Sequence, residues 1–324
     1  MDAKITKERI GQFLSYDWVK VVAVIVAAVF LWMMLFSGLE TDITAAQRYD
    51  VYNYLGTTST PLFKTYSGIS QKGVLSYEVM ESRVMNLPDY PNDYDELMLA
   101  AVTLNEVDAL FVPDIEGDGS FSYTDDKGQT KVATYLETVV YKYYADVLKM
   151  NGEKGLFALV ENYLAPYYPN GYADPTALNK TKVEEDFRAN VKREKDKRYK
   201  TEESIQAALP KEYARIESYA RALVEFKGYL QNGIVAVDDR TYYLRNSVGD
   251  LTIDVSQASI NLCVDETKTD LTDLAYYTVG EGENAKPSSK DLHIVLFKQP
   301  AGLERFTGDH LLFVNEIIRG ALVS

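Results

Sequence analysis

A run of nineteen uncharged residues near the N-terminus, Val21 to Leu39, constrains the fold of this 324-residue chain more than any other segment. Its sequence is VVAVIVAAVFLWMMLFSGL. At about 1.5 Å of rise per residue, a helix of this length measures about 28 Å, which is close to the roughly 30 Å hydrocarbon thickness of a bilayer. The run therefore predicts a transmembrane helix over residues 21–39, with the lipid bilayer as the partner of this segment.

The charges on either side of the run predict its orientation. Four basic residues lie in positions 1–20, whereas Arg48 is the only basic residue in the twenty positions after the run. By the positive-inside rule, residues 1–20 form a cytoplasmic tail and residues 40–324 form an extracellular domain. The predicted location is thus the cell membrane, with a single pass.

A cleavable signal peptide is the alternative interpretation of the same run. Its apolar region would normally measure about 7 to 15 residues and be followed directly by a small-residue cleavage site. Here the run is longer, and Glu40 and Asp42 separate it from the nearest small-residue site, Thr44 to Ala46. These two observations favour an uncleaved anchor.

The rest of the chain is strongly acidic. Of its 34 basic and 48 acidic residues, only 4 and 3 lie in the first twenty positions, which leaves a net charge of −15 beyond them. This balance argues against nucleic acid as a partner, because nucleic-acid binding depends on Lys and Arg neutralising phosphates. Cys263 is the single cysteine, so no disulfide can form within the chain, and a hydrophobic core must stabilise the domain.

Beyond the run, apolar patterning predicts strands and helices in alternation, then a helical middle and a strand-rich end. The predicted strands are residues 49–57, 73–85, 107–112, 233–237, 242–245, 251–255, 258–264, 275–279 and 292–298. The predicted helices are residues 94–103, 132–151, 155–164, 182–198, 204–231 and 309–322. This order indicates an α/β domain, with a lobe boundary near residues 165–180.

One stretch resembles a known family. Asp93 to Asp114, DYDELMLAAVTLNEVDALFVPD, is similar to the second helix and third strand of the extracytoplasmic solute-binding proteins of bacterial ABC importers. In that family an Ala-rich helix end leads to a strand that begins and ends with Asp. The matching positions are Ala100, Ala101, Asn105, Asp108, Phe111, Val112 and Asp114.

The resemblance implies a periplasmic-binding-protein-like fold of type II, with a reduced lobe and a ligand cleft between lobes. Gram-positive members usually carry a lipidated N-terminal cysteine, and residues 21–39 take the place of that anchor here. The chain also resembles uncharacterised clostridial-type single-pass proteins with this layout. The implied function is a membrane-anchored extracytoplasmic binding module for a small solute, glycan or peptide. The alternative is a non-catalytic structural or interaction subunit that contacts a membrane partner protein.

Signatures of catalysis and cofactor binding are missing from the sequence. The two histidines, His293 and His310, have neither a nucleophile motif nor metal-ligand spacing beside them, so we expect both to be structural. The nucleophile-elbow, phosphate-binding and dinucleotide-binding motifs do not occur. The sequence therefore predicts no enzyme activity and no catalytic, cofactor or metal residues.

An acidic loop at residues 114–125, DIEGDGSFSYTD, has partial calcium-loop spacing. Asp114, Glu116, Asp118 and Asp125 stand at positions one, three, five and twelve, where oxygen ligands would suit Ca²⁺. Against this, position three is the longer Glu, position twelve is the shorter Asp, and a strand leads into the loop. The sequence favours a solvated acidic turn and keeps calcium as the alternative.

Tyrosine is abundant, with 25 residues in the chain. The turn-rich connector Ala165 to Pro175 holds three of them and is our candidate for an aromatic wall or a hinge, although packing explains most tyrosine clusters.

The tract Lys180 to Lys200 holds nine basic and five acidic residues. It predicts a solvated helix with ion pairs such as Glu184 with Arg188; contact with teichoic acids, lipid headgroups or an acidic partner is the alternative.

Overall fold

The computed structural model divides the chain into two compact units, Met1–Thr44 and Ala45–Ser324. Every residue of the three hydrophobic core clusters lies in the second unit, so this unit has the complete core that independent folding requires. The structure describes residues 18–37, 47–54, 57–58, 73–90, 92–124, 127–241, 256–280 and 282–323, together with positions 7 and 11.

The first unit contains the helix α2, Trp18–Ser37. Its side chains include exposed apolar groups such as Val24 and Trp32, of which Trp32 is 65% exposed. Among the described residues, no helix meets the combined length and apolarity of a membrane span. The predicted run continues past α2, and its last two residues, Gly38 and Leu39, lie outside the described residues, as does most of the predicted tail at 1–20.

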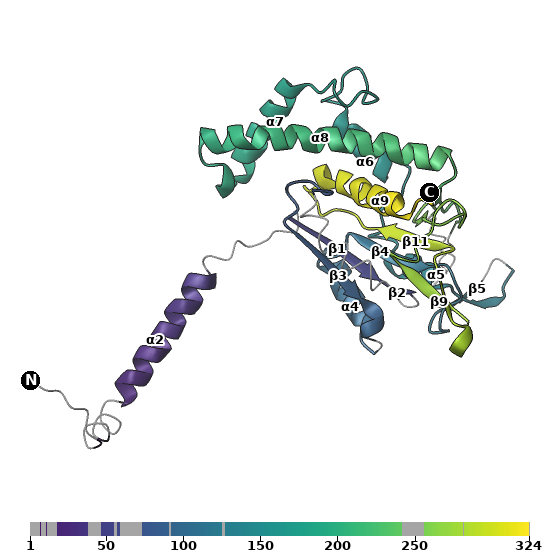
Figure 1. The fold of residues 1–324 in the computed structure, drawn as a ribbon, viewed down its shortest axis with the longest axis horizontal. Coiled ribbons are helices and arrows are strands. Elements are labelled where there is room, and N and C mark those ends of the chain that lie inside the picture. The colour runs from purple at the N-terminus through teal and green to yellow at the C-terminus, as the bar shows by residue number, and fades with distance from the viewer. Residues whose placement is uncertain are drawn as a thin grey trace, which may run out of the picture. The chain divides into compact units, whose positions relative to one another are not determined.

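A six-stranded mixed sheet forms the centre of the second unit (Figure 1). From one edge to the other, its strands are β3 (Glu81–Asn86), β1 (Arg48–Asn53), β4 (Ala109–Pro113), β11 (Leu292–Leu296), β8 (Ile260–Asn261) and β7 (Ala236–Val237). β1 is parallel to both β3 and β4, whereas β11 runs antiparallel between β4 and β8. The predicted α/β class is thus confirmed, with a mixed sheet.

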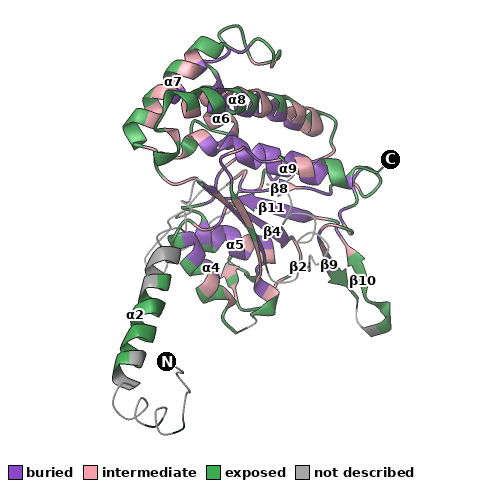
Figure 2. Cartoon of the chain, turned by 60° about the vertical axis from the view of Figure 1, so that its left-hand side comes forward, coloured by how far each residue is buried: buried purple, intermediate pink, exposed green. Residues whose placement is uncertain are grey.

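Helices cover both faces of this sheet, which explains why β4 and β11 are buried along their whole length. Helices α4 (Tyr94–Thr103) and α5 (Tyr135–Tyr143) pack on one face, where Leu110 and Val295 point. Helix α9 (Gly308–Ala321) packs on the other face, where Phe111 and Ile294 point. Figure 2 shows buried residues, in purple, along α5, α9 and the central strands.

A layer of three further helices lies over α9 (Figure 1). We call it the helical layer; it comprises α6 (Leu156–Leu164), α7 (Lys180–Glu194) and α8 (Glu202–Gln231). The long helix α8 begins at Thr201, whose hydroxyl accepts a hydrogen bond from the Ser204 N–H in a capping box. Its buried face packs on α9 through residues such as Tyr219 and Phe226.

Short elements complete the second unit. A three-stranded sheet has the order β10 (Lys286–Ser288), β9 (Tyr276–Val279), β2 (Thr57–Thr58), and a hairpin joins β5 (Ser122–Thr124) to β6 (Thr130–Val132). The 3₁₀ turns are η3 (Leu87–Asp89), η4 (Lys197–Tyr199), η5 (Gly282–Asn284) and η6 (Glu304–Phe306).

Several predicted elements were wrong in extent, and the strands predicted over 233–237 and 258–264 shorten to β7 and β8, of two residues each. The helix predicted over 132–151 is shorter, because β6 occupies its start and the capping box of Thr134 with Glu137 fixes the first turn of α5. The strand predicted over 73–85 begins only at Glu81, since Ser76 bonds to a carboxylate instead of a neighbouring strand. The strand β10 was not predicted. The predicted strands at 242–245 and 251–255 lie outside the described residues.

Candidate functional site

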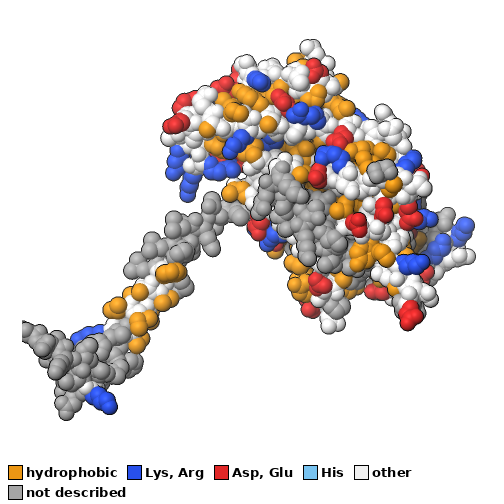
Figure 3. Space-filling model, viewed as in Figure 1, with side chains coloured by type: hydrophobic (Ala, Val, Ile, Leu, Met, Phe, Trp, Pro, Cys, Tyr) orange, Lys and Arg blue, Asp and Glu red, His pale blue; other side chains and the backbone are white. Residues whose placement is uncertain are grey.

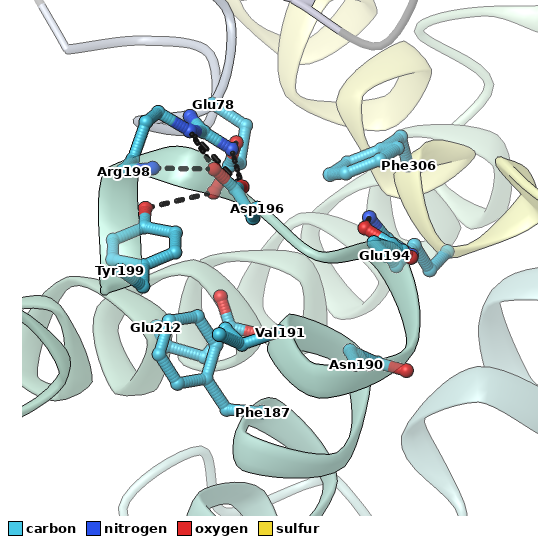
Figure 4. Close-up of a pocket in the computed structure, with 11 residues that line it drawn as sticks. Glu78, Phe187, Asn190, Val191, Glu194, Asp196, Arg198, Tyr199, Glu212 and Phe306 are labelled. Carbon is cyan, nitrogen blue, oxygen red and sulfur yellow. Dashed lines mark hydrogen bonds and ion pairs between the residues drawn. The ribbon is translucent and has the colours of Figure 1, made fainter. Parts of the chain in front are cut away.

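A narrow pocket with about 30 Å³ of interior space lies beside the helical layer (Figure 4). Phe187 and Asn190 line it from α7, and Glu212 lines it from α8. Its lining also includes Arg198 and Tyr199 of η4, Glu78 of the segment 73–80, and Arg305 and Phe306 of η6. The pocket therefore joins the helical layer to segments that are distant from it in sequence.

A sharp turn at the end of α7 places η4 over this pocket. Lys195 caps α7 in the left-handed conformation, with φ of 53°, which reverses the chain. Asp196 then caps η4 by accepting a hydrogen bond from the Arg198 N–H at 2.9 Å. The guanidinium of Arg198 also contacts Asp196 at 2.7 Å, and this pairing holds the pKa of Asp196 below its usual value.

The same guanidinium connects η4 to the segment 73–80. Nη2 of Arg198 lies 2.7 Å from Oε2 of Glu78, and the Tyr199 hydroxyl donates to Oε1 of Glu78 at 3.4 Å (Figure 4). Both contacts satisfy a carboxylate whose side chain is nearly buried. Glu78 and Arg198 thus form one wall of the pocket.

The deepest part of the site is a buried ion pair on α8. Arg215, with a side chain only 2% exposed, donates to Glu212 through Nε at 2.9 Å and through Nη2 at 2.5 Å. The Tyr163 hydroxyl accepts from Nη2, and the backbone oxygen of Arg305 accepts from Nη1. Burial raises the pKa of Glu212, but Arg215 outweighs burial and keeps that pKa below its usual value.

Aromatic rings and a second carboxylate extend this buried cluster. The guanidinium of Arg215 lies 5.2 Å from the ring centroid of Tyr219 and 5.5 Å from that of Phe306. The Tyr219 hydroxyl donates to Asp309 at 2.8 Å, and Ser76 donates to Asp309 through both its N–H and its hydroxyl, at 2.7 and 3.0 Å. Burial raises the pKa of Asp309. We refer to Glu212, Arg215, Tyr219, Asp309 and Ser76 as the Arg215 cluster.

A further polar chain lies next to Asp309, on the sheet side. Asp108 accepts from the Asp50 N–H and from Nε2 of Gln299, both at 2.7 Å. The imidazole of His310 lies between Gln299, at 3.3 Å, and the Tyr49 hydroxyl, at 3.0 Å. Burial raises the pKa of Asp108 to about 7 and lowers that of His310 to about 4. At neutral pH, His310 is therefore uncharged and Asp108 is poised between its two forms.

The lining offers charged and aromatic side chains for polar and ring contacts. Carboxylates outnumber guanidinium groups in the lining by four to two, and aromatic rings lie among them. No cysteine or histidine lines the pocket. In the described part of the chain, no group of three or more His, Cys, Asp and Glu side chains could hold a metal ion.

Of the features that the sequence singled out, the tract Lys180 to Lys200 contributes to this pocket, through residues such as Phe187 and Arg198, whereas the acidic loop and the connector do not. In the acidic loop at 114–125, Asp114 pairs with Arg240 at 2.9 Å and Asp118 accepts from the Ser120 N–H, while Asp125 lies outside the described residues. This geometry is that of an acidic turn. In the connector, the Tyr168 hydroxyl donates to the backbone oxygen of Pro175, and the aromatic lining of the pocket comes from other segments.

Both histidines are buried, and neither lines the pocket. His293 is buried beside Ser259, with 2.9 Å between Nδ1 and the hydroxyl oxygen, and burial lowers its pKa. His310 belongs to the polar chain described above. Sequence reasoning missed the Arg215 cluster entirely. The one local signal was Glu212 three residues before Arg215 on an otherwise apolar helix face.

Comparison of the chain with protein-family models, with curated proteins and with solved structures gives no match.

Proposed function

We propose that this chain is a membrane-anchored extracytoplasmic binding module. The run Val21 to Leu39 would hold it in the bilayer, and α2 supports this by forming a helix with exposed apolar side chains over most of the run. Three neighbouring strands of the sheet lie in the order β3-β1-β4, so the strand that comes first along the chain lies between the next two strands of this sheet. Open doubly wound sheets have this order. It is consistent with a type II periplasmic-binding-protein-like domain in which the helical layer replaces one lobe.

The observation that carries the proposal is the pocket beside the helical layer. A binding module of this kind needs a concave site with convergent polar groups and aromatic walls, and the pocket supplies both. Its lining holds four carboxylates and two guanidinium groups, which favours a cationic group that competes with the arginines for the carboxylates. The ligand class that we propose is a small amine whose ammonium group enters the pocket.

A thermal-shift screen of residues 45–324 tests this function. The panel would contain choline, agmatine and tyramine, with sugars and dipeptides for comparison. Because a ligand that binds only the native state stabilises it, about 2.7 kcal/mol is expected at one hundred times Kd. A stabilisation by amines supports the proposal; no stabilisation by any compound contradicts it.

The variant Asn190→Trp makes the screen specific to the pocket. A Trp at this lining position would fill the space in front of Glu212 from a partly exposed position on α7, so the amine-induced shift should disappear while the Tm without ligand is kept. Gln231→Trp, at the far end of α8, is the matched control and should keep the shift. A shift that survives Asn190→Trp would place the ligand elsewhere.

Carbonate extraction and protease treatment of intact cells test the anchor. We expect the full chain to stay in the membrane fraction at high pH and its 45–324 unit to be digested from outside. Release of the full chain by carbonate, or complete protection from protease, would contradict the predicted orientation.

A second candidate function is a non-catalytic interaction subunit of a membrane complex. It is favoured by one specific observation: each carboxylate in the pocket lining already pairs with an arginine, as Glu194 does with Arg305 and Glu212 with Arg215. Such a site could serve only to clamp segments together. A negative ligand screen, combined with co-purification of a membrane protein with the full chain, would favour this candidate.

A further inference from the structure

The Lys-rich tract at 180–200 divides into a paired and an unpaired part. On α7, Lys182 pairs with Asp186 at 2.7 Å, and Arg188 pairs with both Glu184 and Glu202, at 2.9 and 2.6 Å. These are the ion pairs of an ordinary solvated helix. They confirm the predicted Glu184–Arg188 pair and account for the first half of the tract.

Beyond Arg188 the charges are no longer balanced. We define the basic tip as Lys192, Lys195, Lys197 and Lys200; all four are exposed, and none forms an ion pair or a side-chain hydrogen bond within the part of the chain that the structure describes. The two carboxylates among them are neutralised by arginines, Glu194 by Arg305 and Asp196 by Arg198.

The four lysines lie together in space. They occupy the end of α7 and the turn that leads through η4 into α8, where Lys195 reverses the chain direction. Figure 3 shows basic side chains gathered at this end of the helical layer, on the left of the view. The whole chain has a net charge of −14, so this cluster of unpaired positive charges is confined to one part of an acidic protein. Such a surface fits an anionic partner.

We propose that the basic tip binds the anionic headgroups of a lipid bilayer. This inference rests on the proposed membrane anchor, because the anchor would keep the domain near the bilayer: the nine residues between Ser37 and Gln47 span at most roughly 35 Å. Each Lys near an anionic surface contributes about 1 kcal/mol, so four are enough for a weak contact that tethering strengthens. The rest of the acidic domain is repelled, which would orient the tip toward the lipid.

Vesicle binding of residues 45–324 tests the surface without the anchor. The fragment carries an N-terminal His-tag and is held on vesicles that contain nickel-chelating lipid, in phosphatidylcholine alone or with phosphatidylglycerol. Acetylation of lysines by a soluble reagent is then measured by mass spectrometry. We expect the four lysines of the basic tip to be protected severalfold on phosphatidylglycerol vesicles, and this protection to be lost at high salt.

Matched variants complete the experiment in sedimentation assays without nickel lipid. Changing Lys192, Lys195, Lys197 and Lys200 to Gln should weaken binding to phosphatidylglycerol vesicles on the order of a thousandfold. The control changes four exposed lysines elsewhere to Gln, with the same change in charge, and should alter binding less than threefold. These control positions are Lys154, Lys211, Lys286 and Lys290.

Three outcomes would overturn the proposal: equal protection on both vesicle types, equal weakening by the two variants, or protection by soluble poly(glycerol phosphate) but not by vesicles. The last would identify a free phosphate polymer as the partner. Carbonate release of the full chain would contradict the anchor alone, since the tagged fragment does not contain α2.

Discussion

Arg215 and Arg188 lie on neighbouring helices and each pairs with a glutamate of its own helix, but Arg215 is buried and Arg188 is partly exposed. Arg215 on α8 pairs with Glu212, three residues before it, and its side chain is 2% exposed; Arg188 on α7 pairs with Glu184, four residues before it, and its side chain is 33% exposed. Removing one partner of a buried pair leaves an uncompensated charge, whereas water solvates the groups of an exposed pair. Burial, not spacing, therefore decides which pair the fold depends on.

The largest expected effect follows from removing Arg215. Arg215→Ala should lower the free energy of unfolding of residues 45–324 by about 3–5 kcal/mol, because Glu212 would stay buried without its partner. Urea denaturation would measure this loss.

The double variant Glu212→Gln with Arg215→Met is the control for that measurement. It removes both charges, so it should recover a large part of the lost stability. If the double variant were as unstable as Arg215→Ala, the loss would come from packing against Tyr163, Tyr219 and Phe306, and the charge argument would fail.

The next effect tests how tightly the Arg215 cluster is packed. A Cβ at Gly308 would lie 2.4 Å from the ring carbon Cγ of Tyr219, so Gly308→Ala should cost about 1–3 kcal/mol through displacement of that ring. Gly320→Ala, in the same helix, is the control; its Cβ would meet only the flexible end of Leu274 at 3.3 Å. Equal unfolding free energies for the two variants would show that the ring of Tyr219 adjusts freely.

The pH dependence of stability should reveal the polar chain of Asp108 and His310. Because the folded pKa of Asp108 is raised to about 7, its contribution to stability is lost as pH rises from about 4 to 7. Because the folded pKa of His310 is lowered to about 4, its contribution is lost as pH falls from about 6.5 to 4. The two slopes oppose each other, and each is at most about 1.4 kcal/mol per pH unit.

Asp108→Asn should remove the part of the slope that Asp108 contributes against that of His310. The variant would then lose stability on acidification from about pH 6.5 to 4 more steeply than the parent chain. Urea midpoints at half-unit pH steps would measure this difference, with Asp108→Asn combined with His310→Gln as the control that flattens it. Parallel pH profiles for the parent and the single variant would exclude Asp108 as a titrating group in this range.

The smallest effect is expected at the exposed pair. Arg188→Gln should leave the Tm of residues 45–324 within experimental error, because solvent replaces its contacts with Glu184 and Glu202. Differential scanning calorimetry at low and high salt would measure it. A loss as large as that of Arg215→Ala would remove the distinction between the two regions.

Local signals predicted much of the fold. The helix at 94–103 was predicted with the bounds that α4 has, and β4, α8 and α9 lie within two residues of their predictions, because apolar periodicity and flanking turn residues fix such elements. The hairpin of β5 and β6 was missed, although the capping box at Thr134 marks the true start of α5.

The candidate site could not be predicted in the same way. Its pocket is lined from the segment 73–80, α7, η4, α8 and η6, and in the adjoining Arg215 cluster the hydrogen bond from Ser76 to Asp309 joins positions 233 residues apart. Hydrophobic periodicity describes one helix or strand at a time, so it cannot indicate a contact between residues so far apart in the sequence. The polar residues involved also look like ordinary solvated side chains in sequence, since only burial in the fold distinguishes Arg215 from Arg188.

The position of β11 in the sheet determines how early during synthesis the second unit can fold. β11 pairs with β4 in the register Leu292 to Pro113, and it also holds β8 beside it, so the central sheet stays incomplete until nearly the whole chain has been synthesised. Pairings of such sequence separation slow folding, because a long loop must close before they form. A nascent chain that lacked β11 would leave the backbone N–H and C=O groups along one edge of β4 without partners, so folding of this unit should follow the synthesis of β11.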